Sequence, residues 1–408
     1  MVEAPCTLST RPLVAVHGFL AAGDTWSSMA QRFASNGQCF ERVRAFDWDS
    51  LSGSGKETAE RLDAFIDRVR EETGATQIDL IGHSAGGGLA YDYLSLPEHA
   101  AKVARYVHVA SFLRNAPAGP SDAPVPTLNL WSDGDTVVRE KGDISGAQNL
   151  MLPGLDHYAV ATSEASFRAV AEFLDGSAPS GASIAPSPSA RLAGKALQLG
   201  SNAPVTGRVD IYELDGDGER TGPAVASYRT AADGAWGPHH GRPSIAYELV
   251  VVHDDVDELP IHYYREPFSR TNDLVYLRTL PPASSLAGAL LSSLKYDDGH
   301  VIAIVFSASR ALLAGRDTLE VDGTPLPLES VATAEKSAIA LFLDDGNLNG
   351  ESERTPLAGL ANFPFLGGLD LFLPTEPSKV VPFRLNGRTL RVRNWRSASD
   401  GPVVAVFD

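Results

Sequence analysis

The chain has 408 residues, 43% of them hydrophobic and 21% charged, a composition typical of folded globular proteins. Its length exceeds what one hydrophobic core usually serves, so two or three domains are expected. The net charge of −17 argues against nucleic acid as a partner, because a phosphate backbone is bound through Lys and Arg. No stretch approaches about 18 uninterrupted apolar residues, so no transmembrane segment is expected.

The first part of the chain alternates short apolar strands with helices. Strands are predicted at 13–16, 43–48, 77–82, 104–111 and 126–132. Helices are predicted at 24–35, 56–74, 86–96 and 163–174. In the second helix, Leu62, Phe65, Ile66 and Val69 recur with the helical period, and Gly74 ends it. The alternation predicts a mostly parallel sheet covered by helices on both faces.

The second part of the chain loses the long helical periodicity. Small residues and Pro at 176–190 predict a semi-flexible linker. Beyond it, apolar runs broken by Asp and Gly turns predict a β-sandwich or barrel region divided near residue 268. The expected organisation is a first domain at 1–175, the linker, a β domain at 191–268 and a second β-rich domain at 269–408.

Ser84 lies in the sequence Gly82-His83-Ser84-Ala85-Gly86, between a predicted strand and a predicted helix. Glycines two positions on either side permit the tight turn of a nucleophile elbow, which lifts the serine hydroxyl clear of the sheet. The alternative is a glycine-rich turn with a solvated serine. The strand-to-helix context favours the elbow, so Ser84 is the predicted nucleophile.

An acid and a base follow Ser84 in the order expected for this kind of site. Two aspartates compete for the acid: Asp135, followed by Thr-Val-Val, fits the position better than Asp133, which precedes a glycine as turn residues do. His157 is the only histidine between these aspartates and the linker. It is the predicted general base, with Asp135 holding its tautomer; a surface-loop histidine is the alternative.

The sequence Val16-His17-Gly18-Phe19 ends the first clear strand. Acyl transfer develops a negative oxygen that preorganised N–H groups must stabilise. The backbone N–H groups of Phe19 and Ala85 are the predicted oxyanion hole. We expect His17 to stabilise the loop through hydrogen bonds rather than to act as the base. Such a mechanism requires no cofactor.

These motifs resemble the small, minimal α/β-hydrolase lipases of Bacillus over residues 12–175. The matching stretches are VAVHGF, IDLIGHSAGG, WSDGDTVV and GLDHYAV, although the elbow begins with Gly82 where those lipases have Ala. The resemblance implies a minimal α/β-hydrolase that cleaves carboxylic esters. The β region, with HYYREPFSRTNDLVYLR at 262–278, resembles the Archaeoglobus-type lipase architecture, and its first part resembles a transthyretin-like β-sandwich.

The leading interpretation is a lipase or long-chain carboxylesterase that acts on lipid or other ester substrates through an acyl-enzyme. One alternative is a polyesterase acting on insoluble polyester, and another is a surface-binding protein with a vestigial hydrolase. The short interval between Asp135 and His157 leaves no room for a helical lid. Residues 280–296 and 360–374 are therefore candidate covers, with ordinary β-domain core as the alternative. The sequence leaves the oligomeric state open.

Asp345, Asn347 and Asn349 match the first half of a Ca²⁺ loop, D-x-N-x-N-G. The twelfth position, where such loops carry a bidentate acid, is Pro356. A polar hairpin turn is therefore the alternative to a calcium site.

The two cysteines are predicted to form a disulfide. Cys6 precedes the strand at 13–16, and Cys39 precedes the strand at 43–48, so both are expected at the same edge of the sheet. The bridge would stabilise the fold by about 3–4 kcal/mol; free thiols in a cytoplasmic enzyme are the alternative. The N-terminus shows no signal peptide, but a disulfide favours a secreted protein whose leader is absent from this chain.

Overall fold

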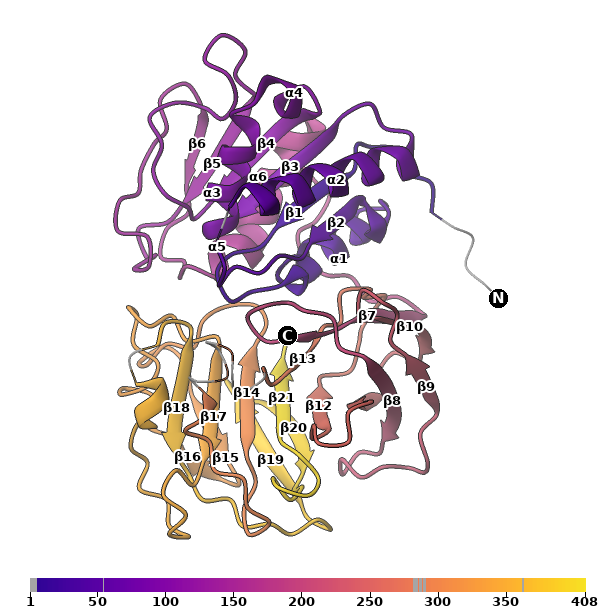
Figure 1. Cartoon of the computed structure of the whole chain (residues 1–408), viewed down its shortest axis with the longest axis vertical. Helices are drawn as coiled ribbons and strands as arrows, with labels where there is room; N and C mark the ends of the chain where they lie inside the picture. The colour runs from indigo at the N-terminus through magenta and orange to yellow at the C-terminus, as the bar shows by residue number, and fades with distance from the viewer. Residues whose placement is uncertain (1–5, 54, 282–284, 286–287, 289–290, 362) are drawn as a thin grey trace. The chain divides into compact units, whose positions relative to one another are not determined.

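The structure is a computed structural model that describes residues 6–53, 55–281, 285, 288, 291–361 and 363–408. The chain divides into two compact units, which are described separately (Figure 1). The N-terminal unit consists of Met1–Pro186, Gly200–Asn202 and Thr271–Leu274. The β unit consists of Ser187–Leu199, Ala203–Arg270 and Val275–Asp408.

The N-terminal unit is built on a six-stranded parallel sheet with the order β2-β1-β3-β4-β5-β6. Its strands are β1 (Leu13–Val16), β2 (Val43–Phe46), β3 (Ile78–His83), β4 (Val103–Val109), β5 (Thr127–Trp131) and β6 (Gln148–Met151). Its helices are η1 (Gly23–Trp26), α1 (Ser27–Ser35), η2 (Phe40–Arg42), α2 (Lys56–Thr73), α3 (Ala85–Leu94), α4 (Pro97–Ala100), α5 (Ala159–Thr162) and α6 (Glu164–Asp175). The predicted α/β-hydrolase fold class is confirmed.

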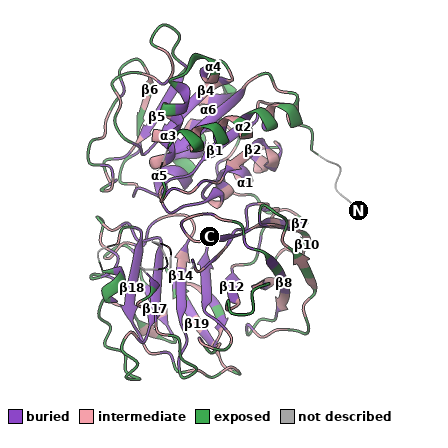
Figure 2. Cartoon of the chain, in the orientation of Figure 1, coloured by how far each residue is buried: buried purple, intermediate pink, exposed green. Residues whose placement is uncertain are grey.

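Figure 2 shows that the central strands of this sheet are buried. Because both faces of such a strand are covered, its sequence is almost continuously apolar. Helix α2 packs Leu62, Ile66 and Val69 into the core and ends at Gly74, whose φ of 69° suits glycine. Strand β6 was not predicted from the sequence. It is a short edge strand, and three of its four residues are exposed, so the apolar signal is weak.

A disulfide joins Cys6 to Cys39 with a Cα–Cα distance of 5.6 Å, which confirms the predicted pairing. Part of the expected linker is also held in the N-terminal unit. The Asn36 side chain donates to Gly181 O at 2.9 Å and accepts from Gly181 N at 3.1 Å. Ala185 N donates to Ser35 Oγ at 3.0 Å. Residues 181–185 therefore follow the end of α1 instead of forming a flexible connection.

The β unit contains sheets of eight, four and three strands, ordered β18-β17-β14-β21-β12-β11-β8-β9, β16-β15-β19-β20 and β10-β7-β13. The strands are β7 (Ala190–Gln198), β8 (Gly207–Leu214), β9 (Ala226–Arg229), β10 (Ala235–Gly241), β11 (Ala246–His253), β12 (Ile261–Arg265), β13 (Leu277–Thr279), β14 (Ala303–Ser307), β15 (Leu319–Val321), β16 (Thr324–Pro325), β17 (Ala340–Asp344), β18 (Leu366–Asp370), β19 (Val380–Leu385), β20 (Arg388–Arg393) and β21 (Val403–Phe407). The short helix η3 (Ala358–Leu360) precedes β18.

The expected division of the β region at residue 268 is not what the structure shows. The last strand, β21, lies between β12 and β14 and pairs in parallel with both, with Val403 opposite His262 and Ala303. The eight-stranded sheet therefore crosses the expected boundary between 191–268 and 269–408. Such pairing between distant strands leaves no mark in a local sequence pattern.

The two candidate covers have different outcomes. Part of 280–296 lies outside the described residues, and its described Leu291 and Leu294 are buried. The segment 360–374 contains β18, every residue of which is buried in the eight-stranded sheet. That strand is core, as the alternative interpretation held.

None of the described helices is both long enough and apolar enough to cross a membrane.

Candidate active site

Ser84 forms the turn between β3 and α3 with φ 54° and ψ −122°, a conformation that costs energy for a residue with a Cβ. A Cβ on Gly82 would lie 2.6 Å from Gly86 O, and one on Gly86 would lie 2.4 Å from His17 O. Only glycine fits either position, as the predicted elbow requires. The Ser84 side chain is partly exposed and does not cap α3.

Asp135 and His157, which follow β5 and precede α5, meet in the buried interior. The Nδ1 atom of His157 lies 2.8 Å from Oδ2 of Asp135, and the two side chains are only 2% and 1% exposed. The other oxygen, Oδ1, accepts hydrogen bonds from Val137 N at 2.8 Å and Val138 N at 3.2 Å. Burial alone would raise the pKa of Asp135, but the hydrogen bond from His157 and these backbone bonds bring it below its usual value.

Asp133, the competing acid, is exposed and has a different partner. Its Oδ1 accepts a hydrogen bond from Gly154 N at 2.7 Å. Nearby, a Cβ on Gly134 would lie 2.7 Å from the carbonyl carbon of Gly154. Asp133 therefore ties the acid loop to the histidine loop, and the geometry supports Asp135 as the partner of His157.

His83 connects the histidine loop to the elbow, a role that the sequence analysis missed. Its Nε2–H donates to His157 O at 3.0 Å, and the two rings lie 4.8 Å apart. Burial, together with the neighbouring His157, lowers the pKa of His83 to about 3, so its ring is neutral. His157 is thereby held against the residue that precedes Ser84. The sequence feature that could have indicated this role is the position of His83 directly before the predicted nucleophile, Ser84.

The loop after β1 packs directly on the elbow. A Cβ on Gly18 would lie 2.9 Å from Ser84 Cβ, so Phe19 follows a glycine in contact with the predicted nucleophile. Ala85, the other predicted oxyanion donor, is the first residue of α3. The buried His17 ring donates from Nδ1 to Gly18 O at 2.8 Å and accepts at Nε2 from Trp48 N at 3.2 Å. Its expected structural role in the loop is confirmed.

Two exposed apolar side chains lie beside the elbow and were also missed. Ser111, after β4, donates from Oγ to Ser84 O at 2.6 Å. The next residues, Phe112 and Leu113, are 61% and 41% exposed. The Nε2–H of His108 donates to Phe112 O at 3.0 Å, so the backbone of this segment is fixed while its apolar side chains face solvent. In the sequence, they read as an ordinary strand end.

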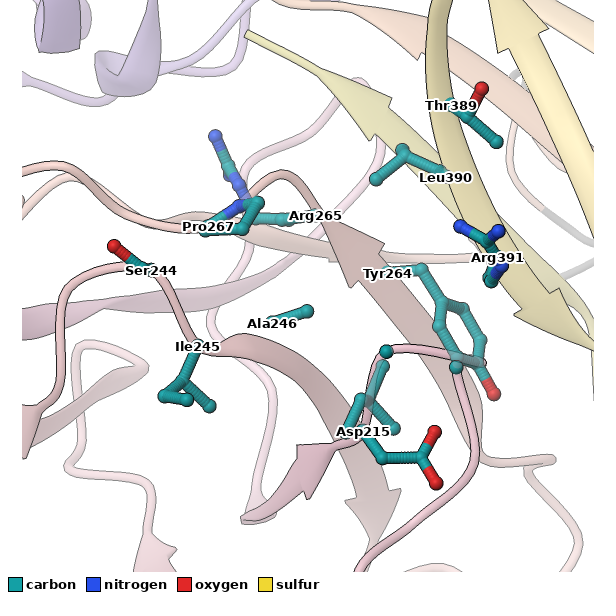
Figure 3. Close-up of a pocket in the computed structure, with 13 residues that line it drawn as sticks. Asp215, Ser244, Ile245, Ala246, Tyr264, Arg265, Pro267, Thr389, Leu390 and Arg391 are labelled. Atoms are coloured by element: carbon teal, nitrogen blue, oxygen red, sulfur yellow. The ribbon is translucent and has the colours of Figure 1, made fainter.

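The β unit has a hollow of about 350 Å³ where β8, β11, β12 and β20 end or pass (Figure 3). Figure 3 shows Ser244 and Ile245 across the hollow from Leu390 and Arg391. Its lining contains no histidine or cysteine, and Arg265 in its wall is paired with Asp408. The lining therefore offers neither a histidine base nor a thiol nucleophile for acyl transfer.

The calcium candidate forms a closed turn. The carboxylate of Asp345 accepts hydrogen bonds from Asn349 N at 3.2 Å and Gly350 N at 2.8 Å. The side-chain amides of Asn347 and Asn349 donate to Glu353. Within the described ranges, no group of three or more His, Cys, Asp or Glu residues is placed to hold a metal ion. The geometry is that of the polar turn, and calcium binding at Asp345, Asn347 and Asn349 stays an untested prediction.

Each of the two regions is similar to a known protein family. Residues 11–150 match the model of the alpha/beta hydrolase fold, and residues 188–282 match that of the lipase C-terminal domain. An abhydrolase domain-containing protein of Caenorhabditis elegans is 34% identical over 100 residues, which cover 22% of this chain and 21% of the relative. The match thus spans about a fifth of that relative's length.

Two solved structures are similar to part of the chain. Aspergillus fumigatus lipase B is 13% identical with a TM-score of 0.33, over 44% of this chain and 57% of the lipase. A predicted CIB-like hydrolase from Thermoplasma acidophilum is 19% identical with a TM-score of 0.31, over 41% of this chain and 88% of that protein. The first family model coincides with the parallel sheet and its elbow, and the second with the start of the β unit. Residues 11–150 therefore have the alpha/beta hydrolase fold, and residues 188–282 are similar to the lipase C-terminal domain.

Proposed function

We propose that this α/β-hydrolase cleaves carboxylic esters with Ser84 as nucleophile, His157 as general base and Asp135 as the acid that orients the base. The observation that carries the proposal is the buried 2.8 Å bond between Asp135 and His157, formed by a histidine whose own carbonyl is bound by the residue before Ser84. A carboxylate on Nδ1 keeps the proton there and leaves Nε2 as the basic atom.

The proposed reaction proceeds in two halves. Ser84 Oγ attacks the ester carbonyl while His157 takes its proton, and the same proton then leaves with the alcohol. The backbone N–H groups of Phe19 and Ala85 stabilise the negative oxygen, and the N-terminal end of α3 adds a favourable dipole. Water, deprotonated by His157, then releases the carboxylic acid and restores the serine.

The apolar side chains beside the elbow favour esters of long, apolar acids. Phe112 and Leu113 are exposed immediately after Ser111, which is hydrogen-bonded to the backbone of the nucleophile. Covering such side chains with an acyl chain removes apolar surface from water, worth about 25 cal/mol per Å². We therefore favour a lipase or long-chain carboxylesterase; a polyesterase is an outcome of the substrate test below.

Covalent labelling tests the nucleophile. A fluorophosphonate should modify the full chain once, at Ser84, and Ser84→Ala should abolish both labelling and hydrolysis of p-nitrophenyl butyrate. Ser95→Ala is the matched control, because Ser95 is exposed at the other end of α3. Label that persists in Ser84→Ala, or is lost in Ser95→Ala, would overturn the assignment.

A series of p-nitrophenyl esters from acetate to palmitate, followed by clearing of a polyester suspension, tests the substrate class. The double variant Phe112→Ser, Leu113→Ser should lose kcat/KM on long esters and keep it on acetate. Leu96→Ser controls for the loss of an exposed apolar residue elsewhere. Equal losses on short and long esters would contradict the acyl-contact role, and polymer clearing that exceeds long-ester activity would favour a polyesterase.

We propose that the protein works in an oxidising, extracytoplasmic compartment, because reducing compartments rarely preserve a disulfide such as Cys6–Cys39. Thiols should be undetectable in the denatured, unreduced chain isolated from its source organism. Two titratable thiols per chain would contradict this location.

A further inference from the structure

The short segment Gly200–Asn202 belongs to the N-terminal unit, although its neighbours in the sequence belong to the β unit. It forms a tight turn after β7, closed by a hydrogen bond from Gln198 N to Ala203 O at 2.8 Å. Asn202 has a φ of 55°, a conformation that Asn tolerates better than most residues, and its side chain is buried. A strained, buried polar residue at this place needs an explanation.

The amide of Asn202 joins two loops that follow adjacent strands. Its Nδ2 donates to Ala21 O and to Trp48 O, each at 2.9 Å, and lies 3.2 Å from His17 Nε2. Ala21 belongs to the loop after β1, and Trp48 follows β2. Because two carbonyl oxygens face the same nitrogen, only the amide orientation with Nδ2 toward them is possible.

The consequence for His17 is a fixed ring. Since Nε2 accepts from Trp48 N, the proton lies on Nδ1, which donates to Gly18 O. The C=O and N–H of a trans peptide point in opposite directions. Holding the Gly18 carbonyl toward His17 therefore sets the direction of the Phe19 N–H. Gly18 itself contacts Ser84, so this peptide lies at the proposed reaction centre.

We propose that Asn202 is a positioning residue for the oxyanion loop: it fixes the loop and the His17 ring, and through them the Phe19 peptide. This inference rests on the proposed esterase function, because an oxyanion matters only to acyl transfer. A residue acting in this way affects the transition state more than the bound substrate, so its loss lowers kcat with little change in KM.

Asn202→Gly is the sharpest variant, because glycine accepts the positive φ and removes only the amide. With p-nitrophenyl butyrate and the full chain, kcat should fall about 10- to 100-fold at nearly constant KM. Asn202→Asp keeps the size of the side chain but turns an oxygen toward two carbonyl oxygens. Its kcat should fall at least as far. It also supplies the measurement if the glycine variant does not fold.

Asn36→Ala is the matched control. Asn36 also holds a later segment, at Gly181, but it lies before the start of β2, whereas the elbow follows the end of β3, at the opposite end of the parallel strands. Its kcat should equal that of the unmodified chain. Wild-type kcat in both Asn202 variants, a change confined to KM, or an equal fall in Asn36→Ala would overturn the positioning role.

Labelling separates the two proposals. If a fluorophosphonate labels Ser84 in the unmodified chain while Asn202→Gly keeps full kcat, the esterase function stands and the role of Asn202 fails. If Ser84 is not labelled at all, the proposed function fails, and the role of Asn202 fails with it. Stoichiometric but slower labelling of Asn202→Gly is the result that supports both.

Discussion

Each unit of the molecule buries a histidine against a carboxylate at nearly the same distance. In the N-terminal unit, His157 Nδ1 lies 2.8 Å from Asp135, and in the β unit, His262 Nδ1 lies 2.7 Å from Glu248. Both histidines are almost fully buried, and both carboxylates are more so. By this local geometry alone, either pair could serve as the acid and base of a hydrolase.

The surroundings of His262 exclude that role. Its Nε2 lies 2.9 Å from Asp400 O, so each of its two ring nitrogens faces an oxygen of the protein. Arg220 binds Glu248 through two hydrogen bonds, and Trp395 stacks on the histidine ring. Both ring nitrogens of His262 are therefore already engaged within the protein. His157, by contrast, is held through its carbonyl by His83, the residue that precedes the strained turn at Ser84.

The comparison teaches that a buried histidine–carboxylate pair is an ion-pair motif first and a catalytic motif only in context. What differs is the second ring nitrogen and what lies next to it. Changes at the pair Asp135–His157 should therefore affect turnover, whereas changes at the pair Glu248–His262 should affect folding.

The largest expected effect is on turnover in Asp135→Asn. Oδ1 of Asp135 accepts two backbone hydrogen bonds, so an asparagine must keep its oxygen there and turn its NH₂ toward His157. That forces the ring proton of His157 onto Nε2, and this nitrogen then cannot accept the proton of Ser84. We expect kcat on p-nitrophenyl butyrate to fall about 10³- to 10⁴-fold with folding intact.

Asp133→Asn is the control for this prediction. Its Oδ1 accepts a hydrogen bond from Gly154 N, and an asparagine oxygen can do the same. Activity should therefore remain within about threefold of the unmodified chain, a free-energy change below about 1 kcal/mol. A larger loss in Asp133→Asn than in Asp135→Asn would mean that the acid is misassigned.

The two units also differ in how much of their structure can be predicted from the sequence. The elbow is mostly a local pattern: a Cβ on Gly82 would meet the backbone of Gly86 in the same turn, whereas Gly86 is required by the loop after β1, at His17 O. The sheet and its helices follow from apolar periodicity for the same reason. The positions of Asp135 and His157 follow from chain order, which a parallel sheet converts into proximity at one edge.

What the sequence could not foretell depends on distant partners. Asn202 lies far along the chain from the loop that it holds, and nothing in its neighbours signals the contact. The place of β21 between β12 and β14 is likewise set by pairing across most of the β unit. Exposed Phe112 is apolar at a strand end, which a periodicity argument assigns to the core.

The next effect in size is on folding, in Glu248→Gln. Glutamine keeps the shape, but it removes the negative charge shared by Arg220 and His262, and Glu248 is fully buried. Breaking a buried ion pair costs about 3–5 kcal/mol. We expect that loss in the unfolding free energy measured by chemical denaturation, with the kcat of the folded protein unchanged.

Glu213→Gln is the matched variant for Glu248→Gln. Its bond to Arg242 is as short, but Arg242 is 66% exposed, so the loss should stay within about 1 kcal/mol. Similar losses in the two variants would contradict the assignment of Glu248 as a folding residue. A loss of kcat without a loss of stability would break the distinction between the two pairs.

The smallest expected effect is the acid sensitivity that His83 gives to the N-terminal unit. Burial and the adjacent His157 lower the pKa of His83 from its ordinary 6.5 to about 3, so the unfolded chain binds a proton between these values and the folded chain does not. Stability from this group is therefore complete above pH 6.5 and is lost as the pH falls toward 3. Between pH 6.5 and 5, His83 alone should lower the unfolding free energy by about 2 kcal/mol.

His83→Gln retains a side-chain N–H for His157 O but no titrating ring. Between pH 6.5 and 5, the unfolding free energy of the variant should fall by about 2 kcal/mol less than that of the unmodified chain. An equal fall in the two proteins would show that His83 is protonated in the folded state.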